Sequence, residues 1–265
     1  MKKILLLLLL SVTGFSQTLD PTFDTDGIAS FHVNDIASKQ LAYDAALQAD
    51  GKLVCVGKLT SPFTQTFISR YNTDGSKDYT FNQSGFLTKG STTFQTVAIQ
   101  NDDKLVVAGL FSIFRFLTDG SPDLSFNSTG FKTISFNNQN MNINHIEFQT
   151  NDKVIVSGYI SNGTNNDFAI AQLNSDGTLD TTFDTDGILI LAIGTANDQA
   201  YSHKIQNDGK IVVFGETFNG TNYDFVVARI NSDGTLDTSF GSNGKVTTTF
   251  TASSIDRCFN GGYLI

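Results

Sequence analysis

The sequence predicts an all-β fold, a β-propeller made of four-stranded antiparallel blades. A ten-residue motif, QADGKLVCVG at Gln48–Gly57, returns at intervals of 52, 49 and 57 residues. Each period holds four short runs rich in Val, Ile, Phe and Thr, and no run has a helical period. Four strands in a repeat of about 50 residues are typical of a propeller blade. The later copies of the motif are Gln100–Gly109, Gln149–Gly158 and Gln206–Gly215.

The first sixteen residues have the pattern of a secretory signal peptide. Lys2 and Lys3 precede an apolar run over residues 4–10, and Gly14 and Ser16 precede a cleavage point before Gln17. The run is too short to cross a bilayer, and no later stretch approaches the length of a membrane span. We therefore expect export of the chain to the periplasm, the cell surface or the medium, with a retained anchor as the alternative.

The mature chain, residues 17–265, divides into about four and a half units. The second unit is short, because only ten residues separate Gly109 from Asp119 where the later units have 18. The last unit stops at Ile265, near the point where the next motif is due, so we expect a truncated chain or an incomplete ring. The predicted bounds are 17–75, 76–120, 121–177, 178–234 and a partial unit at 235–265.

The four runs of a unit are clearest in residues 178–234. They are Gly187–Ile193, Tyr201–Gln206, Lys210–Glu216 and Asp224–Asn231. Asp208-Gly209, between the second and third runs, predicts a two-residue hairpin whose central residues both need a positive φ. Asp50-Gly51 occupies this position in the first unit, and Asp102-Asp103 and Asn151-Asp152 in the middle units. A parallel β-helix is the alternative fold, but it does not need these repeated hairpins.

A second motif follows the fourth run of each unit. It reads NSDGTLDTTF at Asn174–Phe183 and begins with another Asp-Gly turn. We expect its final Phe, together with the apolar run Leu53–Val56 and its copies, to fill the core between blades. The Phe occurs five times, at Phe23, Phe81, Phe126, Phe183 and Phe240.

Composition limits the partners and the redox chemistry. The chain has 17 basic and 26 acidic residues, a formal net charge of −9, which disfavours nucleic acid as a partner. Two cysteines are too few for a disulfide framework. Cys55 replaces a Val of the motif and is predicted to be a small core residue. A Cys55–Cys258 bridge would tie the ends of the chain if the ring closed there, and the sequence does not decide that pairing.

The two alternating motifs together resemble the delta-60 repeat, a β-propeller repeat of secreted bacterial proteins. The resemblance covers residues 19–265 and is most specific at Asp176–Phe183 and Gln206–Gly215. An Arg four residues before the second Asp-Gly turn also fits, at Arg70, Arg115 and Arg229, with Gln172 as the exception. The resemblance implies a propeller and export. It supplies no reaction and no catalytic residue.

Clustered aspartates are the candidates for a metal site. Carboxylates on a turn can hold Ca²⁺ through oxygen ligands, so a calcium site is one interpretation of the two richest clusters. The other interpretation, which we favour, is that the first Asp accepts backbone N–H bonds in a turn or pairs with the repeated Arg. The candidates are Asp20, Asp24 and Asp26 before Gly27, and Asp180, Asp184 and Asp186 before Gly187.

No other residues suggest a catalytic or cofactor site. The repeated Lys and Gln beside each hairpin, such as Lys52 and Gln48, are predicted to be structural because every unit has them. His145 and His203 lie at different distances from their motifs, so we expect them not to face one another. The three scattered histidines, His32 included, make a zinc site improbable. The chain has no Trp, which argues against propeller types with repeated Trp.

Three functions are compatible with these observations. The first is an exported, non-enzymatic binding or scaffold module for a protein or glycan partner, without a cofactor. The second is a calcium-stabilised, adhesin-like module. The third is a lyase or hydrolase on a propeller scaffold, which would need non-repeating charged residues near the central axis.

Overall fold

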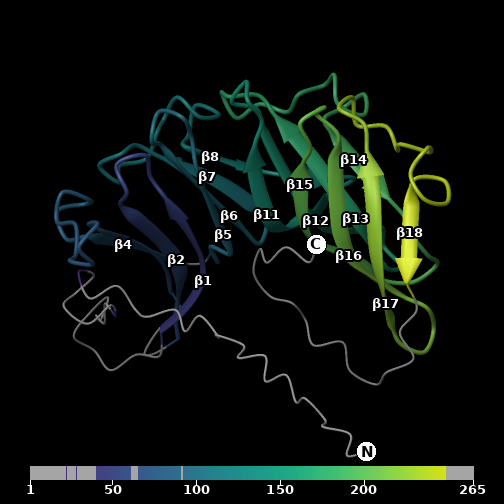
Figure 1. Cartoon of the computed structure of the whole chain (residues 1–265), viewed down its shortest axis with the longest axis horizontal. Coiled ribbons are helices and arrows are strands. Elements are labelled where there is room, and N and C mark those ends of the chain that lie inside the picture. The colour runs from purple at the N-terminus through teal and green to yellow at the C-terminus, as the bar shows by residue number, and fades with distance from the viewer. Residues whose placement is uncertain (1–21, 23–27, 29–39, 61–64, 91, 249–265) are drawn as a thin grey trace, which may run out of the picture.

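The computed structural model describes residues 40–60, 65–90 and 92–248, together with Thr22 and Ile28. In this part of the chain, four antiparallel sheets of four strands follow one another in an arc (Figure 1). These residues form no helix, so none is present that could cross a bilayer. The predicted signal peptide, Phe23 and Cys258 lie outside the described residues.

We call the four sheets the first to fourth blades, and in each the strands lie in chain order. The first blade contains β1 (Gln40–Leu47), β2 (Leu53–Leu59), β3 (Gln65–Tyr71) and β4 (Phe86–Gly90). The second contains β5 (Thr96–Ile99), β6 (Leu105–Gly109), β7 (Ser112–Phe116) and β8 (Phe131–Thr133). The third contains β11 (Asn142–Phe148), β12 (Val154–Ser161), β13 (Asn166–Leu173) and β14 (Ile188–Leu191). The fourth contains β15 (Asp198–Ile205), β16 (Ile211–Phe218), β17 (Tyr223–Ile230) and β18 (Lys245–Thr248).

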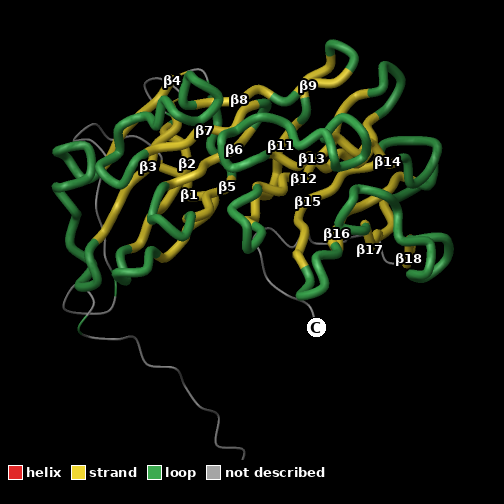
Figure 2. The backbone as a smooth tube through the Cα atoms, turned by 90° about the horizontal axis from the view of Figure 1, so that it is seen from above, coloured by secondary structure: helices red, strands yellow, loops and turns green. Residues whose placement is uncertain are grey.

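The first strand of each blade is its inner strand. Contacts join β1 to β5, β5 to β11, and β11 to β15, while β4, β8, β14 and β18 lie at the other edge of their blades. Figure 2 shows the same blades from above, and they do not close into a ring. The propeller prediction is confirmed, and the antiparallel pairing excludes a parallel β-helix.

The blades are offset from the sequence units by one strand. The run that opens the fourth unit, Gly187–Ile193, contains β14, which pairs with β13 of the third blade. The second motif of each unit therefore lies between the third and fourth strands of one blade. Its final Phe consequently faces the blade that comes next in the chain.

The prediction of two-residue hairpins at the first Asp-Gly turn is wrong. The N–H of Gln48 donates to the carbonyl of Lys52 and the N–H of Gly51 to that of Gln48, which encloses three residues. Only the last of the three has a positive φ, +83° at Gly51 and 62° at Asp103. A three-residue loop, made of a type I turn followed by one residue with a positive φ, is also compatible with the twist of the two strands. It needs only one residue that tolerates a positive φ, where the two-residue loop needs two.

The Gly that ends the first motif is required by a close approach. The inner strand carries a β-bulge opposite this Gly in the first, third and fourth blades. A Cβ atom on Gly158 would lie 1.8 Å from the carbonyl oxygen of Asn142, and on Gly57 2.0 Å from that of Leu41. No side chain fits there, so the Gly recurs in each copy.

The repeated Phe forms the core between blades, as predicted. Phe81, Phe126 and Phe183 are fully buried. Phe81 packs with Val54 and Val56 of its own blade and with Val107 of the next. The turn of the next blade covers the ring, since a Cβ on Gly120 would lie 2.9 Å from Phe81. One aromatic ring per unit thus fastens each blade to its successor.

Candidate functional site

A cluster of repeated polar side chains surrounds each buried Phe. In the first blade, the Arg70 Nε donates to Asp78 Oδ2 at 2.7 Å, and Lys52 lies 3.2 Å from the same oxygen. The Arg70 Nη1 donates at 2.5 Å to the carbonyl of Thr118, in the turn of the second blade. The guanidinium also lies 5.0 Å from the ring centroid of Phe81. The repeated charges therefore join one blade to the next.

Hydrogen bonds hold the Asp of this cluster in its ionised form. Burial raises the pKa of Asp78, but hydrogen bonds from Thr80 and the charges of Lys52 and Arg70 outweigh burial and lower it to about 2. The pKa of Asp123 is lowered in the same way. Because these values fall below the ordinary 3.8, both groups stabilise the fold at neutral pH. That stability is lost as the pH falls from about 4 towards 2.

The calcium candidates have different surroundings. Asp20, Asp24 and Asp26 lie outside the described residues. Asp180 belongs to the third repeated cluster, where its Oδ2 accepts from Lys153 Nζ and Gln172 Nε2, each at 2.5 Å. Asp184 and Asp186 instead line a pocket. Among the described residues, no three His, Cys, Asp or Glu side chains are placed to hold a metal ion.

The pocket begins where the second blade departs from the repeat. The link from β6 to β7 is a tight turn at Leu110–Phe111, with the short length expected from the sequence. The carbonyl of Phe111 accepts from the N–H of Ile134, in the connection to the third blade, and the carbonyl of Leu110 accepts from the N–H of Ile143, at the start of β11. That connection holds an extra hairpin, β9 (Ser135–Phe136) and β10 (Gln139–Asn140). The short turn is thus hydrogen-bonded to the connection that carries the hairpin.

The β9–β10 hairpin is a feature that our sequence interpretation missed. Its two central residues, Asn137 and Asn138, have φ values of 48° and 61°, so this is a true two-residue turn. The Asn-Asn pair after Phe136 is the signal that could have revealed it.

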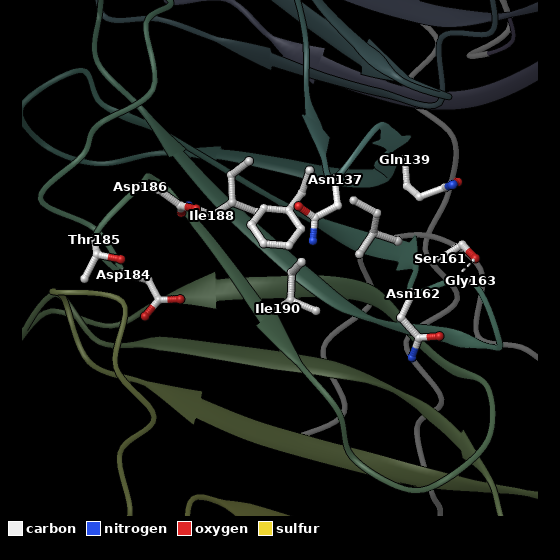
Figure 3. A pocket seen from close by; sticks show the side chains of 12 residues that line it. Asn137, Gln139, Ser161, Asn162, Gly163, Asp184, Thr185, Asp186, Ile188 and Ile190 are labelled. Carbon is white, nitrogen blue, oxygen red and sulfur yellow. Dashed lines mark hydrogen bonds between the residues drawn. The ribbon is translucent and has the colours of Figure 1, made fainter.

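The pocket lies between this hairpin and the third blade and has a volume of about 510 Å³. Figure 3 shows Asp184, Thr185 and Asp186 at one end and Asn162 and Gly163 at the other. Ile188 and Ile190 lie between these ends, from β14. The remaining lining residues are Phe136, Asn137, Gln139, Ile160 and Ser161. An apolar middle with polar groups at both ends suits a small, hydroxyl-bearing ligand.

Two lining carboxylates replace structural donors of the first two blades. At the position of Asp184, Asn82 and Asn127 donate to the carbonyls of Phe86 and Phe131 at 2.8 and 2.9 Å. At the position of Asp186, Ser84 and Thr129 donate to the same two carbonyls. An ionised carboxylate cannot donate. The third blade therefore gives up two hydrogen bonds that the first two blades make.

At the acidic end of the pocket, Asp184 is partly buried, while Thr185 and Asp186 are exposed. Burial raises the pKa of Asp184, and the charges of Asp186 and Asp233 raise it further. Asp186 Oδ1 accepts from the N–H of Ile188 at 2.9 Å. No Lys or Arg lines the pocket, so its field favours neutral or cationic ligands over anionic ones.

The prediction that His145 and His203 do not face one another is wrong. Their Nδ1 atoms lie 3.3 Å apart, and their ring centroids lie 4.6 Å apart. His145 pairs with the residue one before the repeated Gly, and His203 with the residue two before it. Neighbouring inner strands are displaced by one residue, so these different positions meet across the junction between blades.

Of the two histidines, His203 is buried and His145 is partly buried. His203 is 2% exposed, and its Nδ1 lies 2.7 Å from the Oγ of the fully buried Ser157. Burial lowers the pKa of both imidazoles, most strongly that of His203. A Ser–His pair needs an opening to reach a substrate, and neither residue lines the pocket described above.

Cys55 is a free thiol in the structure. Burial, followed by the charge of Asp44, raises its pKa to about 11. The pairing with Cys258, which the sequence leaves open, involves a residue outside the described part of the chain.

A family model described as "Domain of unknown function (DUF5122) beta-propeller" matches the chain four times. The matched residues are 48–81, 100–126, 149–183 and 206–240. Each match runs from the repeated Gln to the repeated Phe, so it contains the first hairpin and the charged cluster. No curated protein matches the chain.

The solved structures that resemble this one share little sequence identity with the chain. A streptogramin B lyase is 14% identical with a TM-score of 0.46, the match covering 76% of this chain and 56% of the lyase. A protein of unknown function from Dyadobacter fermentans is 8% identical with a TM-score of 0.43, covering 78% and 64%. A gluconolactonase from Xanthomonas campestris is 11% identical with a TM-score of 0.39, covering 74% of each chain. The chain thus spans less than two thirds of the first two structures.

These similarities carry no argument about activity. The antiparallel four-stranded blades and the four family matches lead to the same assignment. The chain is a β-propeller repeat protein.

Proposed function

We propose that this chain is an exported, non-enzymatic binding module, and that the pocket between the β9–β10 hairpin and β14 holds a glycan. The observation that carries the proposal is the replacement of two structural donors by Asp184 and Asp186 at this pocket. In a repeat protein, a residue that lowers stability in one copy is expected where function requires it. The proposal of export rests on residues 1–16.

The chemistry of the lining fits a sugar. Carboxylate oxygens accept hydrogen bonds from hydroxyl groups, and the amides of Asn137 and Gln139 can both donate and accept. The Phe136 ring and the side chains of Ile188 and Ile190 offer apolar surface to the C–H face of a pyranose. A volume of about 510 Å³ lies within the range of small-molecule sites.

The test is a glycan array screen of residues 17–265, followed by calorimetric titration with the best ligand. We expect Asp184→Asn and Asp186→Ser each to weaken binding about tenfold or more, near 1.4 kcal/mol, because sugar hydroxyls lose their acceptors. Both variants should fold at least as stably as the parent, since they restore the residues that the first blade has at these positions, Asn82 and Ser84. Phe136→Ala should also weaken binding.

The matched control is Asn82→Asp, which places the same carboxylate in the first blade, away from the pocket. It should lose stability and leave glycan binding unchanged. Unaltered affinity in both pocket variants would contradict the assignment of this site. Turnover of any bound glycan, measured as new reducing ends, would contradict the non-enzymatic part of the proposal.

A further inference from the structure

Two histidines, His145 and His203, meet at the junction between the third and fourth blades. The junction between the first and second blades has the carboxylate of Asp44 at the corresponding place. Between the first and second blades, Asp44 Oδ2 accepts from the N–H of Val97 and the Oγ1 of Thr96, both at 2.9 Å. His145 occupies the position of Asp44 in the third blade, and His203 occupies that of Val97 in the fourth. The His145 Nδ1 accepts from the N–H of His203 at 3.5 Å. The same joint is thus made with two titratable groups.

The contacts of the pair and the burial of His203 favour neutral rings. At the 3.3 Å separation of the two Nδ1 atoms, at least one of them must present a lone pair. The His203 Nδ1 also contacts Ser157 Oγ, and its Nε2 is buried with no partner among the described residues. A proton added to the His145 Nδ1 would oppose the N–H of His203, which that atom accepts. A proton added to His203 would place a positive charge on a buried ring whose Nε2 has no partner among the described residues. If both rings were protonated, like charges would lie side by side.

We propose that the His145–His203 pair is an acid-sensitive joint, which holds the third and fourth blades together when both rings are neutral and loosens when either is protonated. This inference is independent of the proposed glycan site, because neither histidine lines that pocket.

Charged neighbours act on the pair in opposite directions. Glu147 and Asp44 favour protonation of His145, while Lys204 opposes protonation of both rings. Glu147 is itself bound by the Lys204 Nζ and by the N–H of Ile205. Two further strands that pack on this pair of inner strands carry acidic residues. Asp167 of β13 accepts a hydrogen bond from Asn162. Glu216 of β16 accepts a hydrogen bond from Tyr201. Burial is the largest influence on both rings.

The direction of the pH effect follows from this burial. The unfolded chain takes up these protons near pH 6.5, the ordinary value for His, while the folded pair takes them up only at lower pH. The joint is therefore fully stable above about pH 7 and weakens as the pH falls below about 6.5. Each histidine contributes up to a tenfold increase in the opening constant per pH unit.

The experiment is pulsed hydrogen exchange of residues 17–265. The protein is held at pH 7.5 or 5.5 and labelled briefly at one common pH, and protection is measured by mass spectrometry. We expect peptides from β11 and β15 to lose protection about tenfold or more at pH 5.5. Peptides from β1 and β5, whose junction has no histidine, should change far less.

The control variant is His145→Asp/His203→Val, which copies the residues of the first junction. It should keep β11 and β15 protected at both pH values. Equal loss of protection at both junctions of the parent, or an unchanged pH response in this variant, would overturn the proposal. If the double variant does not fold, the pKa values of His145 and His203 in the parent protein are measured by NMR titration. Values below 6.5 for both rings are expected, and an ordinary value for either would reject the joint.

Discussion

At the scale of single residues, the repeated Arg does three things at once. Arg115 pairs with Asp123, lies 4.8 Å from the Phe126 ring centroid, and donates to the carbonyl of Ser175 in the next blade. Its side chain is 6% exposed, compared with 24% for the equivalent Arg229. Among the described residues, Arg229 has no contact with a following turn. We therefore expect Arg115 to contribute more to the free energy of unfolding than Arg229.

We expect Arg115→Gln to lower the free energy of unfolding by about 2 kcal/mol, because buried hydrogen bonds to a charged donor are lost. Gln is the natural residue at this position in the third unit, so the fold should survive. Arg229→Gln is the control and should cost clearly less. Urea titrations followed by circular dichroism measure both, and equal losses would show that the link to the next blade adds nothing.

The histidine pair shows which contacts cannot be predicted from the sequence. His145 and His203 lie at different distances from their motifs, yet their rings meet between two blades. A sequence count gives the register within a blade, while contact between blades depends on how the inner strands are displaced. That displacement comes from packing across the junction and has no counterpart in the spacing of one unit.

At the scale of elements, the first hairpin and its closing Gly could be predicted well. The strands lie close to the predicted runs because alternation and Asp-Gly turns are local signals. The turn type could not be predicted, since both the two-residue and the three-residue loop accept Asp-Gly. The β9–β10 hairpin was missed because it interrupts the repeat, and an interruption has no second copy to compare with.

We expect Gly158→Ala to prevent folding or to cost more than 4 kcal/mol, because its Cβ would overlap the Asn142 carbonyl. A clash with backbone cannot be relieved by a side-chain rotation. Gly90→Ala is the control, since a Cβ there meets nothing within 4 Å. Thermal melting of the two variants separates the cases. A near-native melting temperature for Gly158→Ala would show that the bulge can rearrange.

At the scale of the whole molecule, the blades form a linear array in which each contacts its neighbours. The second and third blades share a large apolar cluster, and the third and fourth share another. In the fourth blade, the ring of Phe240 is only half-buried, and most of β18 is exposed. Stability should therefore vary along the array rather than be uniform.

We expect native-state hydrogen exchange at pH 7.5 to be slowest in β12 and β13 and at least tenfold faster in β17 and β18. The reason is that the third blade is covered on both sides, whereas among the described residues no blade follows the fourth. Mass spectrometry of peptic peptides measures the rates. Uniform protection across the blades would mean that the array opens as a single cooperative unit.

The pocket depends on the second, third and fourth blades, because the N–H of its lining residue Asp184 donates to the carbonyl of Asp233 in the fourth blade. Its walls come from the connection after the second blade and from the third blade alone. Gain or loss of whole units elsewhere would therefore leave its shape unchanged. Recognition in such a protein can be inherited separately from length, so descendants with different numbers of units could keep the same specificity.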